Sequence, residues 1–159
     1  MSELVFSNSE AALFLPLIAQ GIHPCNHLML YGSSGNGKTS ASNIIAKEIT
    51  QGSMLLLTED LDTFLKHDDI RIYLSNITTL NFGIQGARCV IVFNELDKHK
   101  GSLYKLWDIM DKCEDLLMVI FTTNNATDFE APVLSRCDKY EFTKVTPTQF
   151  ANRAVDILK

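Results

Sequence analysis

The chain has 159 residues, of which 46% are hydrophobic and 21% charged, and its formal net charge is −5. This length and composition are typical of one globular domain that buries enough surface to fold without disulfides. The negative net charge argues against a uniformly basic, nucleic-acid-coating surface, although a local basic patch stays possible. No apolar run is long enough to span a membrane, and we expect a cytoplasmic protein.

Apolar runs and helical periodicities alternate along the chain. They predict helices at 9–20, 38–50, 68–80, 102–113 and 147–158, and strands at 27–31, 54–57, 89–93, 116–122 and 139–142. Ser7 or Ser9 is the expected N-cap of the first helix, and 59–69 is expected to be irregular. Alternating strands and helices predict an α/β fold, a five-stranded parallel sheet with helices on both faces.

The four cysteines are spread along the chain, at Cys25, Cys89, Cys113 and Cys137. They form no C-x-x-C pair, and no histidine lies at a spacing typical of zinc ligands. This pattern favours reduced, buried thiols in a cytosolic protein over a zinc site.

A glycine-rich stretch between the first predicted strand and the second predicted helix fits the phosphate-loop pattern G-x-x-x-x-G-K-[ST]. It consists of Gly32, Ser33, Ser34, Gly35, Asn36, Gly37, Lys38 and Thr39, and Ser40 follows in the first helical turn. The glycines let successive N–H groups point at one anion, and the helix adds the positive end of its dipole. Lys38 can then reach the β- and γ-phosphates, and the Thr39 hydroxyl can bind Mg²⁺. We therefore expect ATP and Mg²⁺ as ligands.

Polar residues follow two other predicted strands. Glu95 comes after the strand 89–93 and can act as the base for an attacking water. Asn94 stands where phosphate-loop ATPases have an aspartate, so it can bind Mg²⁺ only weakly or through water. Asn124 follows the strand 116–122 and can orient the water or sense the γ-phosphate, although the segment Thr122–Asn125 is by itself only a turn signal.

These motifs resemble those of AAA+ ATPases, specifically the small subunits of phage, archaeal and eukaryotic sliding-clamp loaders. The resemblance covers 27–142. Residues 26–32 resemble the family's entry into the phosphate loop, 94–97 stand at its D-E-A-D-like box, and Asn124 matches its sensor-1 residue. The segment Leu134–Cys137 matches the S-R-C motif of clamp loaders. The resemblance implies that Arg136 is a finger that acts in trans on a neighbouring subunit, whereas a surface salt bridge is the alternative for this residue.

The resemblance also implies domains and partners. It divides the chain into an N-terminal helical segment (1–26), an AAA+ core (27–145) and the start of a lid-like helix (146–159), so that the helical lid is largely absent. Three alternatives account for this: a minimal version of the protein, a truncated chain, or a lid that another chain supplies. The implied partners are other AAA+ subunits, a sliding clamp and DNA bound without sequence preference. The candidate DNA-binding cations are Lys66, Arg71, Lys98, Lys100 and Lys105, although charged turns are commonly only solvated.

Two hypotheses for function follow. In the first, the chain is an ATP-hydrolysing, clamp-loader-like subunit that acts on DNA during replication. In the second, it is a nucleotide-binding structural subunit with little hydrolysis at its own site, as Asn94 and the missing lid favour. A different AAA+ replication factor, such as a helicase loader or an initiator, is a third possibility that the S-R-C motif disfavours.

Overall fold

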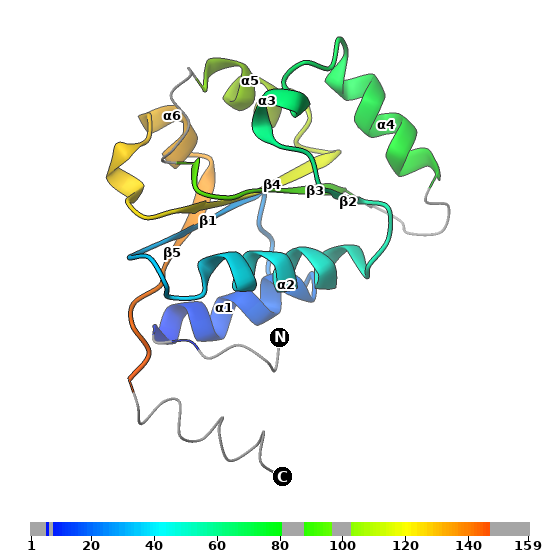
Figure 1. Ribbon diagram of the computed structural model, residues 1–159. Helices are drawn as coiled ribbons and strands as arrows, with labels where there is room; N and C mark the ends of the chain where they lie inside the picture. The colour runs from blue at the N-terminus through cyan, green and yellow to red at the C-terminus, as the bar shows by residue number, and fades with distance from the viewer. Residues whose placement is uncertain (1–5, 7, 81–87, 97–102, 147–159) are drawn as a thin grey trace.

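The computed structural model describes residues 6, 8–80, 88–96 and 103–146, and its centre is one parallel sheet (Figure 1). The strands are β1 (His27–Tyr31), β2 (Leu56–Leu57), β3 (Cys89–Phe93), β4 (Leu117–Thr123) and β5 (Cys137–Glu141). Their order in the sheet is β2-β3-β4-β1-β5, and every pair is parallel. The predicted five-stranded parallel sheet is therefore confirmed.

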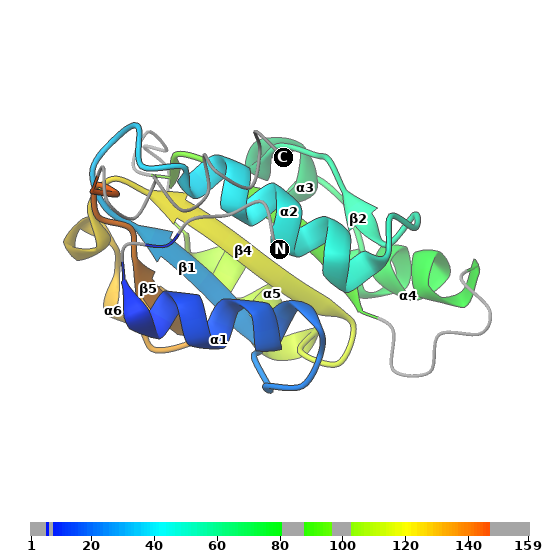
Figure 2. The same cartoon turned by 90° about the horizontal axis from the view of Figure 1, so that it is seen from below.

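Helices cover both faces of this sheet, as predicted. The helices are α1 (Ser9–Ala19), α2 (Lys38–Thr50), α3 (Leu61–Phe64), α4 (Ile70–Leu80), α5 (Tyr104–Lys112) and α6 (Ala131–Leu134), with a 3₁₀ turn η2 (Ala126–Asp128) before α6. Figure 2 shows α1 and α2 side by side on one face, and Figure 1 shows α3, α4, α5 and α6 on the other. No helix in the described part of the chain is long and apolar enough to cross a bilayer.

The central strand β4 shows how the two faces are packed. Successive strand residues point to opposite sides of a sheet. Leu117, Val119 and Phe121 accordingly pack with α3, α4 and α5, whereas Met118 and Ile120 pack with α1 and α2. Because β4 has strands on both sides and helices on both faces, all its residues are buried. This placement explains why Leu117–Phe121 is an uninterrupted apolar run.

Two predictions in the first half of the chain are wrong: one missed a short helix, and the other named the wrong N-cap residue. In both places a side chain caps the helix. The segment 59–69 contains the short helix α3, which Asp60 caps by accepting a hydrogen bond from the Thr63 N–H at 2.9 Å. The N-cap of α1 is Asn8 rather than Ser7 or Ser9, and its Oδ1 accepts from the Glu10 N–H at 2.9 Å. A capping side chain satisfies free N–H groups of the first turn, so either helix can begin there.

The edge strands differ most from their predicted bounds. The strand expected at 54–57 is reduced to β2, and Met54 is 73% exposed because this strand lies at the edge of the sheet. At the other edge, β5 begins at Cys137, two residues before the predicted start. Only Cys137 and Tyr140 of β5 are buried, so its sequence has little apolar periodicity to reveal it. The helix expected at 147–158 lies outside the described residues.

Candidate nucleotide-binding site

The glycine-rich stretch forms the turn between β1 and α2 at the carboxyl edge of the sheet (Figure 1). Gly32, Gly35 and Gly37 have φ angles of +136°, +81° and +82°, which side chains disfavour. A Cβ on Gly32 would lie 2.1 Å from the carbonyl oxygen of Phe142, so the loop passes directly against the chain that follows β5. Asn36 Nδ2 donates to the same oxygen at 2.8 Å. The glycine at position 32 is therefore needed for packing as well as for the turn.

Lys38 connects this loop to the end of β4. Its side chain is buried, and its Nζ donates to the carbonyl oxygens of Gly32 and Ser33 at 2.7 and 2.8 Å. The same Nζ lies 3.3 Å from Oδ1 of Asn124, a residue 86 positions away. An ammonium beside a helix N-terminus and a glycine-rich loop is suited to bind phosphate. The structure thus brings together two residues that were predicted from separate motifs.

Thr122 holds the chain after β3 in place. Its Oγ1 donates to Asn94 Oδ1 at 3.2 Å and accepts from the Glu95 N–H at 3.0 Å. Glu95 has a left-handed φ of 53°. That conformation costs a non-glycine residue about 1–2 kcal/mol, and strained residues of this kind cluster at functional sites. The buried Thr122 hydroxyl therefore fixes the backbone that carries the Glu95 carboxylate.

A cavity of about 320 Å³ opens between these elements, and most of the predicted site residues line it. Its lining comprises Ser34, Gly35, Gly37, Lys38, Thr39, Ser40, Glu95, Thr122, Thr123 and Asn124. Parts of three motifs that lie far apart in the sequence therefore face one cavity, which is the arrangement that a bound triphosphate requires.

The oxygen donors near this cavity fit a magnesium ion bound together with a nucleotide. Thr39 lies exposed in the first turn of α2, and Asn94 lines a neighbouring cavity of about 480 Å³ that shares Glu95. A carbonyl oxygen has two lone pairs, so Asn94 Oδ1 can accept from Thr122 and from a metal-bound water. Magnesium usually keeps several waters and takes one or two protein ligands along with phosphates. Within the described ranges there is no group of three His, Cys, Asp or Glu residues able to hold a metal by themselves.

Arg136 lies at the opposite, amino edge of the sheet. It directly precedes β5, whose first residue Cys137 is in register with His27 at the start of β1. The five residues of β1 therefore separate it from its own phosphate loop, roughly 16 Å at about 3.3 Å per residue. Arg136 Nε and Nη2 donate to the two carboxylate oxygens of Asp111 at 2.6 and 2.5 Å. The salt bridge considered as the alternative for Arg136 is thus present in the single chain.

This amino edge contains a second cavity, of about 440 Å³, which Arg136, Asp111 and His27 help to line. The Arg136 guanidinium holds the pKa of the Asp111 carboxyl below its usual value. His27 is buried, and its Nδ1 accepts from the Val119 N–H at 3.1 Å. Burial, reinforced by the nearby Arg88 cation, lowers the pKa of His27 to about 4, so the imidazole is neutral at pH 7.

All four cysteines are buried free thiols, as the sequence predicted. Burial is the main cause that raises the pKa of Cys137 to about 12 and that of Cys89 to about 11. Thiols with pKa values in this range carry almost no thiolate at pH 7 and are therefore poor nucleophiles.

The predicted DNA-binding cations have different surroundings. Lys66 and Lys105 are exposed, whereas Arg71 forms a fork with the Asp115 carboxylate at 2.8 and 2.9 Å. Near Arg71 and Lys105 the surface also carries Asp68, Asp69 and Asp108, so positive and negative charges alternate there. Lys98 and Lys100 lie outside the described residues.

Sequence reasoning missed four residues that shape the two edges: Thr122, Phe142, Asp111 and Trp107. Thr122 lies two residues before the predicted site residue Asn124, and a hydroxyl at the end of a buried strand was the available signal. Phe142 contributes a backbone oxygen, to which its side chain gives no clue. Asp111 and Trp107 contact Arg136 only because α5 and α6 pack on the same face of the sheet, which no local pattern indicates.

Comparison with known proteins identifies a family for most of the chain. A model of the AAA family, described as "ATPase family associated with various cellular activities", matches residues 28–145. This range contains the phosphate loop, Glu95, Asn124 and Arg136. The peroxisomal ATPase pex6 of Schizosaccharomyces pombe is 25% identical over 145 residues, a match that covers 86% of this chain and 15% of pex6.

Several solved structures share the fold. PCH-2 of C. elegans has a TM-score of 0.62 at 14% identity, with 98% of this chain and 49% of that chain covered. A point variant of RuvB from Thermotoga maritima has a TM-score of 0.61 at 17% identity, with coverages of 94% and 49%. A DNA polymerase III gamma subunit-related protein from T. maritima has a TM-score of 0.58 at 9% identity, with coverages of 87% and 48%. The chain spans about half the length of these three proteins.

Proposed function

Because the chain belongs to the AAA family of ATPases, we propose that it binds ATP with Mg²⁺ at the carboxyl edge of the sheet and hydrolyses it within an oligomer. The contact between Lys38 Nζ and Asn124 Oδ1, in a cavity that Glu95 also lines, supports this proposal most directly. Lys38 binds the phosphates, and Thr39 and Asn94 hold the magnesium ion. Glu95 accepts the proton of the attacking water, and Asn124 orients that water.

The oligomer is part of the proposal because of Arg136. Its guanidinium lies a full strand length from the phosphate loop of the same chain, so it can act only on a nucleotide held by a neighbouring subunit. A planar cation at the γ-phosphate stabilises the charge that develops during phosphoryl transfer. Each interface between subunits then forms one complete site.

We further propose a clamp-loader-like role in the cytoplasm, with DNA and a sliding clamp as partners. The Ser135-Arg136-Cys137 sequence supports this role. Lys66 and Lys105 are the better candidates for phosphate contacts with DNA, because the guanidinium of Arg71 is already bound to Asp115. Contacts of this kind predict a binding constant that falls steeply with salt and depends little on sequence.

A mixing experiment tests the division of the site between subunits. Lys38→Ala removes the nucleotide site and keeps the finger, whereas Arg136→Ala removes the finger and keeps the nucleotide site. We expect each variant alone to be nearly inactive as an ATPase and a mixture of the two to regain part of the activity. Turnover by Arg136→Ala at the unmodified rate would contradict the proposal.

Asn94 supports a second candidate, a nucleotide-binding subunit that scarcely hydrolyses ATP at its own site. Its amide lacks the negative charge that offsets Mg²⁺, and its oxygen already accepts from Thr122. Asn94→Asp restores that charge, and we expect it to increase magnesium affinity and turnover several-fold if weak metal binding limits the site. Nucleotide that binds but is not hydrolysed in the unmodified oligomer, with DNA and clamp present, would favour this candidate.

A further inference from the structure

We propose that Asp111 is a positioning residue for Arg136, and that Trp107 supports the same guanidinium through a cation–π contact. The proposal rests on the function proposed above, in which Arg136 acts on the nucleotide of a neighbouring subunit. It adds the part of the chain that holds this side chain ready before the neighbour arrives. Neither residue belongs to a motif in the sequence.

Hydrogen bonds fix the guanidinium from two sides. Asp111 in α5 accepts from Nε at 2.6 Å and from Nη2 at 2.5 Å, which is the bidentate geometry that Arg and carboxylate groups favour. The carbonyl oxygen of Pro132, in α6, accepts from Nη1 at 2.6 Å. Among the described residues these contacts engage three of the five N–H donors of an arginine, so the other two can bind a phosphate oxygen.

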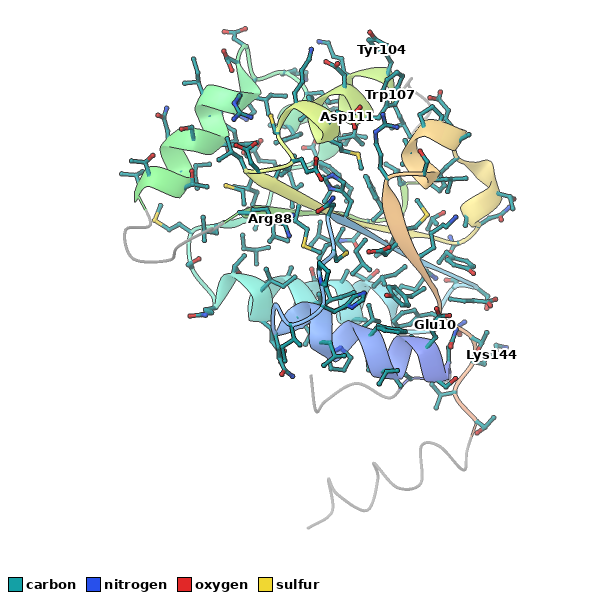
Figure 3. The ribbon with its side chains drawn as sticks, turned by 180° about the vertical axis from the view of Figure 1, so that it is seen from behind. Glu10, Arg88, Tyr104, Trp107, Asp111 and Lys144 are labelled. Atoms are coloured by element: carbon teal, nitrogen blue, oxygen red, sulfur yellow. The ribbon has the colours of Figure 1, made fainter. Side chains whose placement is uncertain are left out.

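Trp107 adds a cation–π contact, in which the guanidinium carbon of Arg136 lies over the Trp107 ring. The centre of its ring lies 5.3 Å from Cζ of Arg136, a distance typical of cation–π contacts. Trp107 and Asp111 are four residues apart in α5, so both side chains lie on the same face of the helix. Figure 3 shows them along α5 together with Tyr104, whose ring meets the Trp107 ring edge-on at 4.8 Å.

This arrangement has the properties that an arginine finger needs. A free arginine side chain has about 2 kcal/mol of rotamer entropy to lose when it binds an anion. Contacts that already fix the guanidinium remove much of that cost, and dipoles held in place stabilise transition-state charge best. The side chain of Arg136 is still 26% exposed, so the fixed group can be reached from outside the subunit.

A second Arg–Asp fork in the same domain offers a matched control. Arg71 in α4 donates to both carboxylate oxygens of Asp115, and its Nη1 also donates to the carbonyl oxygen of Lys112 at 2.6 Å. The two forks therefore have the same chemistry, a bidentate carboxylate and one backbone carbonyl. Only the Asp111 fork contains the arginine that we assign to catalysis.

The test compares ATP turnover by oligomers of Asp111→Ala, Asp115→Ala, Arg136→Ala and the Asp111→Ala/Arg136→Ala double variant, without DNA. We expect Asp111→Ala to lower kcat about tenfold while KM for ATP changes little, because the nucleotide pocket is untouched. Asp115→Ala should keep the unmodified rate. The double variant should be no slower than Arg136→Ala, and Asp111→Glu should recover part of the loss, because it keeps a carboxylate.

A readout other than activity comes from Trp107, the single tryptophan of the chain. Arg136→Ala removes the positive charge over the indole ring, and Asp111→Ala releases the guanidinium so that it no longer stays over the ring. We therefore expect Arg136→Ala and Asp111→Ala to change the tryptophan emission in the same way, with no further change in the double variant. Asp115→Ala should leave the emission spectrum unchanged, and thermal unfolding of each variant checks that the fold is kept.

The outcomes separate the two proposals. Unchanged turnover in Arg136→Ala overturns the proposed action in trans. Slow turnover in Arg136→Ala together with unchanged or faster turnover in Asp111→Ala overturns only the positioning role, and a faster rate would mean that Asp111 restrains the finger. Equal loss of activity in Asp115→Ala and Asp111→Ala would also overturn it, because the effect would then be general to such ion pairs.

Discussion

The two edges of the sheet are built in different ways. At the carboxyl edge, Lys38 lies in the phosphate loop while Glu95 and Asn124 follow strands, so the parallel sheet brings all three to one cavity. At the amino edge, Arg136 is fixed by Asp111 and Trp107, both from α5, a helix packed on one face of the sheet. The first site depends on backbone topology, and the second depends on side-chain packing.

This contrast indicates where each edge is sensitive to change. A parallel sheet places strand ends at one edge whatever the helices carry, so the carboxyl edge should be disturbed mainly by changes in its own motifs. The amino edge should be disturbed by changes in α5, far from Arg136 in the sequence. The four predictions below act on one edge at a time.

Lys38→Ala should have the largest effect, because it removes a buried ammonium from the phosphate loop. We expect ATP to bind roughly 1000-fold more weakly, equivalent to about 4 kcal/mol. Titration calorimetry with a nonhydrolysable ATP analogue measures this loss. Lys47→Ala is the control, since Lys47 is an exposed lysine in the last turn of the same helix. Binding that survives Lys38→Ala would show that the nucleotide lies elsewhere.

Gly32→Ala should destabilise the same edge through packing. The new Cβ would lie 2.1 Å from the Phe142 oxygen at a φ of +136°, so the loop or the chain after β5 has to move. We expect the free energy of unfolding to fall by roughly 3–4 kcal/mol, as measured by denaturant titration. Gly52→Ala is the control, because a Cβ there meets nothing within 4 Å and only the φ of +70° is unfavourable. An equal loss of unfolding free energy in Gly32→Ala and Gly52→Ala would contradict the packing explanation.

His27 should make the amino edge sensitive to acid. Its pKa is about 4 in the folded chain and 6.5 in an unfolded one, so the unfolded chain binds more protons between these values. The contribution of His27 to the free energy of unfolding is complete above pH 6.5. It is lost as the pH falls toward 4, and the loss is at most about 3 kcal/mol. Denaturant titrations from pH 7.5 to 4 measure it. His27→Gln keeps a hydrogen-bond acceptor without a titrating ring, so the same slope in this variant would assign the effect to another group.

Thr122→Val should have the smallest effect of the four. It removes the hydroxyl that accepts from the Glu95 N–H and donates to Asn94. We expect a loss of about 1–2 kcal/mol in unfolding free energy, together with slower ATP turnover, because the Glu95 carboxylate is less firmly placed. Thr122→Ser keeps the hydroxyl and should therefore keep most of the unfolding free energy and most of the ATP turnover. A Thr122→Val variant with normal turnover would show that the strained Glu95 backbone does not need this bond.

The class of fold and most of the carboxyl edge could be predicted from local sequence. Buried strands such as β3 and β4 contain continuous apolar runs, and the phosphate loop has fixed spacing, so both can be predicted from neighbouring residues. Parallel connectivity then follows from the alternation of strands and helices.

The remaining details depend on contacts between distant segments, and the folded structure was needed to find them. The short helix α3 and the strand β5 each have only two buried side chains, so the sequence shows little periodicity that would predict α3 or the first residue of β5. The requirement for glycine at position 32 comes from a backbone oxygen 110 residues further along, in Phe142. Asp111 and Arg136 are 25 residues apart, and nothing in either local sequence favours their pairing. Such contacts arise only when helices pack on the finished sheet, because that packing sets which side chains meet.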